Sequence, residues 1–139
     1  MKGDIRKIVV NQAEYIYRVS DKYDPETGLN TLTVKVFLKG VKRTPLIICF
    51  LTEEDYRVGQ RLNKNVRLLH KPTNSEEWVN LNEPGYIRRL IELGIEQGWN
   101  GTNKLEIQNG MTYLTELGYD VSEMEAEVER RLQTKRMRS

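Results

Sequence analysis

Basic side chains in the first half of the chain are the strongest candidates for a binding site. Phe37 and Tyr56 stand among them, and aromatic rings interleaved with cations are typical of sheets that bind single-stranded nucleic acid. Basic residues at strand tips also keep a protein soluble and protect sheet edges, so both interpretations stay open. The candidate nucleic-acid-binding residues are Lys39, Lys42, Arg43, Arg57, Arg61, Lys64 and Arg67.

Residue types that perform nucleophilic or acid–base catalysis are scarce. Cys49 is the only cysteine, and it lies in the apolar run 46–51, where a thiol behaves as a small buried hydrophobe. His70 is the only histidine, and it precedes two adjacent carboxylates, Glu76 and Glu77. A hydrolase or isomerase that uses His70 with Glu76 or Glu77 is one alternative, and it requires those side chains to meet in one pocket.

Metal and cofactor sites lack their usual sequence patterns. One cysteine and one histidine cannot build the common zinc sites, and no glycine-rich phosphate loop is present. We therefore expect no catalytic residue set, no metal and no cofactor.

Charge is distributed unevenly along the chain. The 139 residues carry a net charge of +2, but residues 1–71 hold 14 basic and 8 acidic side chains, whereas residues 72–139 hold 8 basic and 12 acidic ones. This dipolar pattern weighs against a dedicated nucleic-acid binder, which usually has a dominant positive field. The N-terminus lacks the apolar run of a signal peptide, and the longest apolar run is far too short to span a bilayer, so we expect a cytoplasmic protein.

The first half of the chain has the alternating pattern of antiparallel strands. Apolar residues alternate with polar ones over 14–20 and 31–38, with turn residues at 24–28 and 39–43 between the strands. The run 46–51 is apolar on both faces, which predicts a central strand. Residues 52–64 show no clear periodicity and favour a loop, and a hairpin follows over 66–81.

A helix over 83–98 is the clearest prediction in the second half. Asn82 is suited to cap it and Pro84 fits its first turn. Gly94 interrupts the apolar stripe, which suggests close contact with the sheet. The stripe itself consists of Ile87, Leu90, Ile91 and Ile95.

Glycine followed by an aromatic residue closes two predicted helices. Gly98 suits a left-handed C′ position, and Trp99 would then fold back onto the helix in a Schellman motif. A shorter helix over 109–118 ends in the same way, at Gly118 and Tyr119.

A terminal helix over 122–137 begins at a capping-box pattern formed by Ser122 and Glu125. Glutamates precede basic residues along it, which matches the helix dipole. Its narrow apolar stripe either packs lightly on the domain or pairs with another helix. The candidate interaction residues are Val121, Met124, Val128 and Leu132.

The run from Val79 to Ile91, with its Asn-Glu-Pro sequence at 82–84 and the following Gly98-Trp99, resembles a pattern found in small uncharacterised bacterial proteins. The resemblance is firm over 79–99 and looser over 14–119. It implies a bacterial α+β domain of unknown function and transfers no active site, because its matched positions are structural.

These observations predict an α+β fold, with an antiparallel sheet of about five or six strands followed by a packed helix, a short helix and a C-terminal helix. We expect one domain over 1–120, and an amphipathic helix with a basic tail over 121–139. The leading function hypothesis is a non-enzymatic, cytosolic protein-interaction or accessory module, such as an immunity-type protein, with an unknown protein partner or self-association through the terminal helix. The alternative is single-stranded nucleic-acid binding through the basic strand tips.

Overall fold

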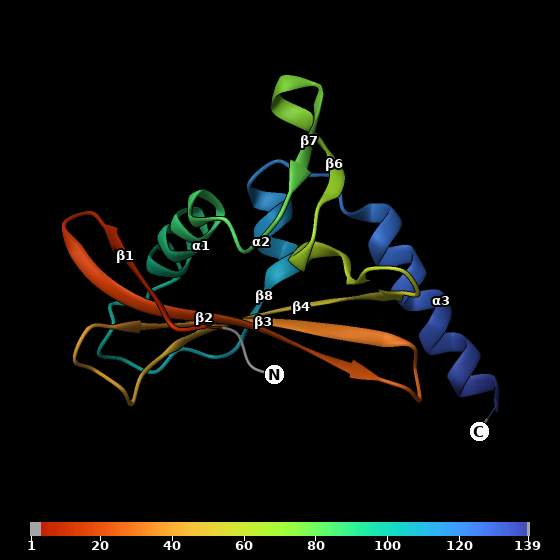
Figure 1. The fold of residues 1–139 in the computed structure, drawn as a ribbon, viewed down its shortest axis with the longest axis horizontal. Helices are drawn as coiled ribbons and strands as arrows, with labels where there is room; N and C mark the ends of the chain where they lie inside the picture. The colour runs from red at the N-terminus through yellow and green to blue at the C-terminus, as the bar shows by residue number, and fades with distance from the viewer. Residues whose placement is uncertain (1–3, 139) are drawn as a thin grey trace.

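A twisted sheet with helices on one side forms the body of the protein (Figure 1). The computed structural model describes residues 4–138, and the side chains of residues 4–137. The sheet has the order β1-β2-β3-β4-β5, and β8 pairs with β4 in parallel. Its strands are β1 (Arg6–Val10), β2 (Ala13–Asp24), β3 (Leu29–Leu38), β4 (Leu46–Asp55), β5 (Gly59–Gln60) and β8 (Gln108–Asn109). The predicted α+β class and mostly antiparallel sheet are confirmed.

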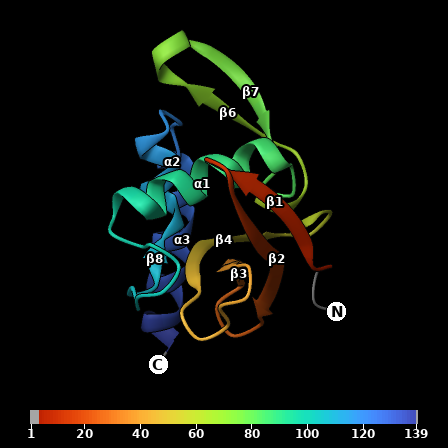
Figure 2. The same cartoon turned by 90° about the vertical axis from the view of Figure 1, so that its left-hand side faces the viewer.

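Three helices and a separate hairpin complete the described fold. The hairpin consists of β6 (Val66–His70) and β7 (Ser75–Val79), and it projects away from the sheet (Figure 2). The helices are α1 (Pro84–Glu96), α2 (Gly110–Glu116) and α3 (Ser122–Arg138). Short 3₁₀ turns occupy Arg61–Asn63 and Lys71–Thr73. Residues 1–3 and Ser139 lie outside the described residues. Residues 1–3 are the first part of the segment for which no signal peptide is expected.

One core lies between the inner face of the sheet and the elements packed on it. The alternating side chains of β2, β3 and β4 supply one half of this core, including fully buried Val34, Ile48 and Phe50. Ile87, Leu90 and other residues of α1, α2 and the hairpin supply the second half. The period-two pattern of the strands and the helical stripe of α1 therefore meet at this interface.

The predicted N-terminal caps of two helices are wrong, although α3 begins at Ser122 as expected. Asn82 does not cap α1, because its amide donates to Asn63 and the helix begins at Pro84 after Glu83. Ser122 does not cap α3 either, because its backbone N–H and hydroxyl both donate to the Asp120 carboxylate. Asn82 therefore bonds a distant residue and Ser122 bonds a nearby one, and neither side chain accepts the helix N–H that a cap would accept.

The glycine-plus-aromatic endings are confirmed. Trp99 N–H donates to Gly94 O at 3.0 Å and Gly98 N–H donates to Ile95 O at 3.0 Å, the two bonds of a Schellman motif. Trp99 is buried and its indole N–H donates to the Thr44 carbonyl at 2.9 Å. Tyr119 closes α2 in the same way, since its N–H donates to Leu114 O at 3.0 Å.

The predicted loop over 52–64 is largely structured. Strand β4 continues to Asp55, and Thr52 is buried inside it. Gln60 explains the order of this segment: its side-chain oxygen accepts from the Thr52 hydroxyl at 2.9 Å, and its amide donates to the Asn30 side chain at 2.9 Å. This buried polar network ties β5 to β3 and β4, which local sequence periodicity does not reveal.

Gly94 allows α1 to approach β4, as predicted. A Cβ atom at this position would lie 2.4 Å from Leu46 Cδ2. The Leu46 side chain is fully buried, and close packing in protein interiors makes it costly to displace.

We predict that Gly94→Ala lowers the free energy of unfolding by about 1–2 kcal/mol, because overpacking outweighs the gain in helix propensity. Gly85→Ala in the first turn of the same helix is the matched control, since nothing lies within 4 Å of its added Cβ. It should leave the stability unchanged or raise it slightly. Urea unfolding of both variants checks the difference, and equal stabilities would contradict the close packing.

Candidate binding surface

The outward-pointing residues of β1 to β4 form a surface on the side of the sheet away from α1 and α2. Residues that pair directly across neighbouring strands share a face, so the register defines four rows across the sheet. We call this set of twelve residues the uncovered face. Its rows, in order along the strands, are Lys7–Ile16–Phe37, Arg18–Lys35–Ile47, Ser20–Thr33–Cys49 and Lys22–Thr31–Leu51.

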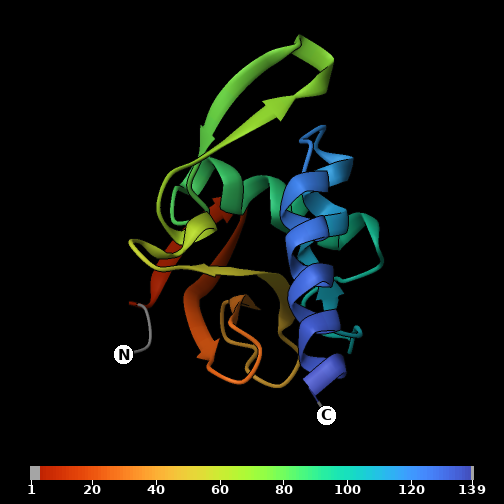
Figure 3. The same cartoon turned by 90° about the vertical axis from the view of Figure 1, so that its right-hand side faces the viewer.

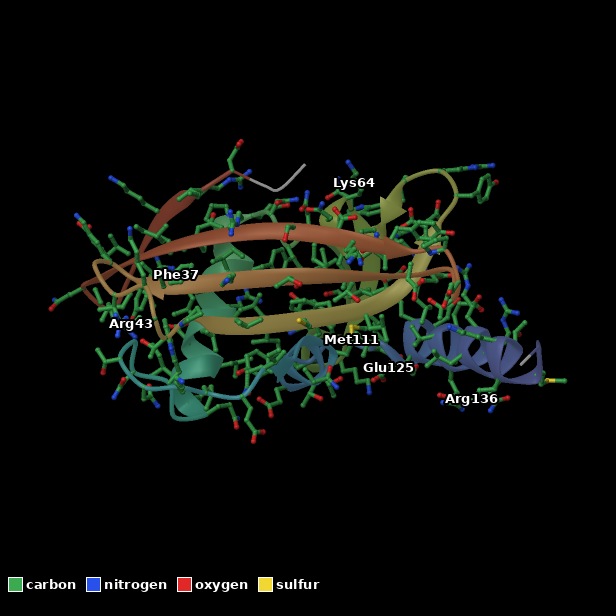
Figure 4. All side chains as sticks on the ribbon, turned by 90° about the horizontal axis from the view of Figure 1, so that it is seen from below. Phe37, Arg43, Lys64, Met111, Glu125 and Arg136 are labelled. Carbon is green, nitrogen blue, oxygen red and sulfur yellow. The ribbon has the colours of Figure 1, made fainter. Side chains whose placement is uncertain are left out.

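Solvent reaches this face directly. In Figure 4, which views the sheet from below, β2, β3 and β4 lie in front, and no helix of the described chain crosses them. Most of its residues on β2, β3 and β4 are half-buried, and Leu51 is 37% exposed. The prediction that 46–51 is a central strand is confirmed, because β4 pairs with β3 on one edge and with β5 and β8 on the other. Its outward residues Ile47, Cys49 and Leu51 nevertheless point to the open side.

The charge of the uncovered face has one sign. Its rows contain Lys7, Arg18, Lys22 and Lys35, and they contain no aspartate or glutamate. Arg18 and Lys35 are directly opposite each other, which places two like charges side by side. Within the described residues, neither of them forms an ion pair with a carboxylate. Two adjacent half-buried cations without a counter-charge are an electrostatic cost that a bound anion would relieve.

Carboxylates appear only beyond the two ends of the face, and two of them are neutralised there. Glu14 forms an ion pair with Lys39 at 2.7 Å, and the hydrogen bond and charge of that lysine lower the pKa of Glu14. At the other end, Glu53 forms an ion pair with Arg61 at 2.8 Å.

A shallow depression lies beside the first row. Its volume is about 290 Å³, and its walls are almost entirely apolar, with one cationic side chain at the rim. Lys35 Nζ lies 5.6 Å from the centre of the Phe37 ring, so a charge also borders the aromatic wall. The lining residues are Ile5, Ile16, Phe37, Leu38, Gly40, Val41 and Lys42.

The predicted nucleic-acid residues separate into two groups. Lys39, Lys42 and Arg43 follow β3, at the end of the sheet where the depression lies. Figure 4 shows Phe37 and Arg43 at this end, and Lys64 well away from them. Lys39 is occupied by Glu14, whereas Lys42 and Arg43 line open hollows in the surface.

The second group has partners of its own. Arg61 pairs with Glu53, and Arg67 approaches Glu76 to 3.6 Å. The Arg57 guanidinium lies 5.2 Å from the ring centre of neighbouring Tyr56. Lys64 is exposed. The two groups therefore do not form one cluster, and only the first borders the uncovered face.

Sequence reasoning missed Arg18 and Lys35 as site residues. Both are polar positions of the alternating strands, but their pairing depends on the β2–β3 register. The signal that could have found them is the sign of the charges at the outward positions, because Arg18, Lys22 and Lys35 are all basic.

Helix α3 uses much of its predicted interaction stripe within the chain. Val121 and Met124 are buried in the common core, while Val128 and Leu132 are half-buried. Figure 3 shows the helix running alongside the sheet. The stripe is thus an intramolecular packing surface over its first turns.

Polar contacts hold the rest of α3 in place. The Arg131 guanidinium donates to the Gly28 carbonyl and lies 3.4 Å from Glu53. Glu127 accepts from Arg131 at 3.0 Å and also from Arg130. Lys135 pairs with Glu26 at 2.8 Å, so the basic residues 130–135 are partly used within the fold. The Arg138 side chain, the last of the predicted basic tail, lies outside the described side chains.

The alternative catalytic pair, His70 with Glu76 or Glu77, is not joined by any hydrogen bond or ion pair within the described residues. The His70 ring nitrogens contact Thr73 Oγ1 at 2.8 Å and the Leu117 carbonyl at 3.1 Å. Glu77 accepts a 2.6 Å hydrogen bond from Tyr119, whose pKa is raised by burial. Glu76 is one position away from Glu77 on β7 and so points to the opposite face of the hairpin from it. His70 and Glu77 fasten the hairpin to residues 117–119, which precede α3.

Clusters of metal ligands and membrane-spanning helices are both absent from the described residues. No cluster of three or more histidine, cysteine, aspartate or glutamate side chains there could hold a metal ion. No described helix has the length and hydropathy needed to cross a membrane.

Glu127 positions Arg131 for its contacts with the sheet. Its hydrogen bonds from Arg130 and then Arg131 lower its pKa to about 2. Because the folded pKa is below the ordinary value, this contribution to stability is present above about pH 4.5 and is lost as the pH falls towards 2.

We predict that Glu127→Gln lowers the free energy of unfolding at pH 7 by about 0.5–1 kcal/mol and that this difference disappears between pH 4.5 and pH 2. Glu129→Gln is the control on the same helix, because its contact with Arg136 is long and exposed. Urea titrations across this pH range provide the measurement. A deficit that persists unchanged at pH 2 would show that the carboxylate charge of Glu127 is irrelevant.

Comparison with known proteins adds no relative: no family model, no curated protein and no solved structure matches the chain. The resemblance to small bacterial proteins therefore stays a prediction. The fold and the surfaces described above are the basis for any functional proposal.

Proposed function

We propose that this chain is a non-enzymatic binding module, an accessory or immunity-type protein of the cytosol, that holds an anionic partner on its uncovered face. One observation carries the proposal: the four rows of this face contain four basic residues and no acidic residue. The remaining positions are hydroxyl-bearing, apolar or thiol side chains. Such a surface supplies hydrogen-bond donors and positive charge to an anion and no carboxylate to repel it.

The pairing of Arg18 with Lys35 makes this surface receptive to an anion. Cross-strand neighbours have Cβ atoms only about 5 Å apart, so their charges repel each other in the free protein. Both side chains are half-buried, which reduces the screening of this repulsion by solvent. An anion placed between the guanidinium and the ammonium group would gain two charge-assisted hydrogen bonds and would remove the repulsion.

Terminal helix α3 is less suited to be the main contact surface. Its buried residues Val121 and Met124 already pack within the chain, and Arg131 is engaged with Gly28 and Glu53. No helix of the described residues crosses β2, β3 and β4 on the uncovered face. We therefore assign the interaction to the sheet face, and not to the helix that the sequence favoured.

We predict that Arg18→Glu weakens anion binding without harming the fold. The new carboxylate would face Lys35 and form a cross-strand ion pair, so the free energy of unfolding should rise by about 0.2–1 kcal/mol. Affinity for short-chain inorganic polyphosphate should fall about tenfold or more, because one cation is removed and the other is neutralised. Amide chemical shifts of ¹⁵N-labelled protein during a polyphosphate titration measure both the affinity and the location.

Arg57→Glu is the matched control, since it makes the same change in net charge at an exposed residue of the distant basic group. It should leave the polyphosphate affinity within about twofold, because salt screens charges over about 10 Å. If both variants lose affinity equally, the protein attracts anions only by its overall charge and the proposal is wrong. Shift changes confined to residues outside the four rows would also contradict it.

A further inference from the structure

We infer that the anionic partner is a single-stranded nucleic acid, with one base stacked on Phe37 in the apolar depression and its backbone crossing Arg18 and Lys35. This inference rests on the proposed function and adds the chemical class of the ligand. It differs from the strand-tip site that the sequence suggested, because the contacts lie on the face of the sheet and only Lys42 and Arg43 of the predicted residues border them.

The depression and the cation pair are adjacent. Ile16 and Phe37, which line the depression, pair directly across β2 and β3. Arg18 and Lys35 form the next row, two residues further along the same strands, which corresponds to about 6.8 Å. An apolar site for a flat ring therefore lies one row from a site for a phosphate, and a nucleotide presents both groups together.

The rows beyond the cation pair continue the same chemistry. Ser20 and Thr33 bring two hydroxyl groups, and Lys22 with Thr31 brings another cation and hydroxyl. A sugar–phosphate backbone that runs along the strands would meet a donor in every row. We expect Phe37 to accept any of the bases, because every base has a π-face that stacks on a phenyl ring.

Other polyanions use this surface less fully. A duplex keeps its bases stacked inside, so it would leave Phe37 and the apolar depression without a partner. An acidic peptide would satisfy the cations, but its backbone N–H groups would face rows that hold no carboxylate and no side-chain amide oxygen. A single strand satisfies both the apolar and the cationic part of the face.

Fluorescence anisotropy with labelled (dT)10 tests this inference on the full chain. Phe37→Leu keeps an apolar wall but removes the aromatic ring, so the affinity for (dT)10 should fall about tenfold while the affinity for inorganic polyphosphate stays unchanged. Phe37→Tyr preserves the ring and should retain the affinity within about twofold. Arg18→Glu should lower the affinity for both (dT)10 and polyphosphate. It should also reduce the steepness of log K against log salt by about 0.7 for each phosphate that the variant no longer neutralises.

Two further ligands, a duplex and an acidic peptide, distinguish the ways in which the inference could fail. A ten-base-pair duplex should bind more weakly than (dT)10 at equal salt, and so should a ten-residue glutamate peptide containing one leucine. If the peptide binds more tightly and displaces polyphosphate, the partner is an acidic protein and the inference is wrong. If polyphosphate binds at Arg18 but Phe37→Leu has no effect on (dT)10, the inference fails while the proposed function stands. If neither polyphosphate nor (dT)10 changes the amide chemical shifts of residues in the four rows, the inference and the proposed function are both wrong.

Discussion

Side chains of a β-strand point alternately to the two faces of its sheet, and in this protein helices and a hairpin close only one of them. Every other feature depends on this constraint. Most inner residues of β2, β3 and β4 are apolar and pack against α1, α2 and the hairpin, with Asn30 and Thr52 as buried polar exceptions. The outer residues do not have to pack into the core, so their side chains are available to bind a partner. Gly94, which lets α1 lie close to Leu46, and Trp99, which is buried against the sheet, keep the inner side closed.

Sequence patterns predicted the strands, turns and helix ends that depend on residues close together in the chain. Alternation identified β3, turn residues marked the ends of the first strands, and glycine-plus-aromatic pairs located the ends of α1 and α2. Elements with distant causes were missed. The order of 52–60 depends on Gln60 reaching Asn30 across the sheet, and Asn82 turns away from its helix to bond Asn63. Local periodicity carries no information about such contacts.

The binding surface was only partly predictable for the same reason. Lys42, Arg43 and Phe37 were identified from their types, and the structure places them at one end of the sheet. Arg57, Arg61 and Arg67 share that chemistry, but tertiary contacts give them aromatic or carboxylate partners. The Arg18–Lys35 pair is a property of strand register, and a shift of one residue would send the two side chains to different environments. Conversely, the apolar stripe of α3 suggested an external partner, whereas Val121 and Met124 complete the protein's own core.

Cys49 provides the most direct test that the uncovered face is the binding surface. It is the only cysteine, it is half-buried, and it lies beside Thr33 in the row next to Arg18 and Lys35. The measurement is the rate of alkylation of Cys49 by N-ethylmaleimide, a neutral reagent, with and without saturating polyphosphate. We expect the bound anion to slow the reaction severalfold in the natural protein and to have no effect in Arg18→Glu. An unchanged rate in the natural protein, at concentrations where polyphosphate is bound, would contradict the account.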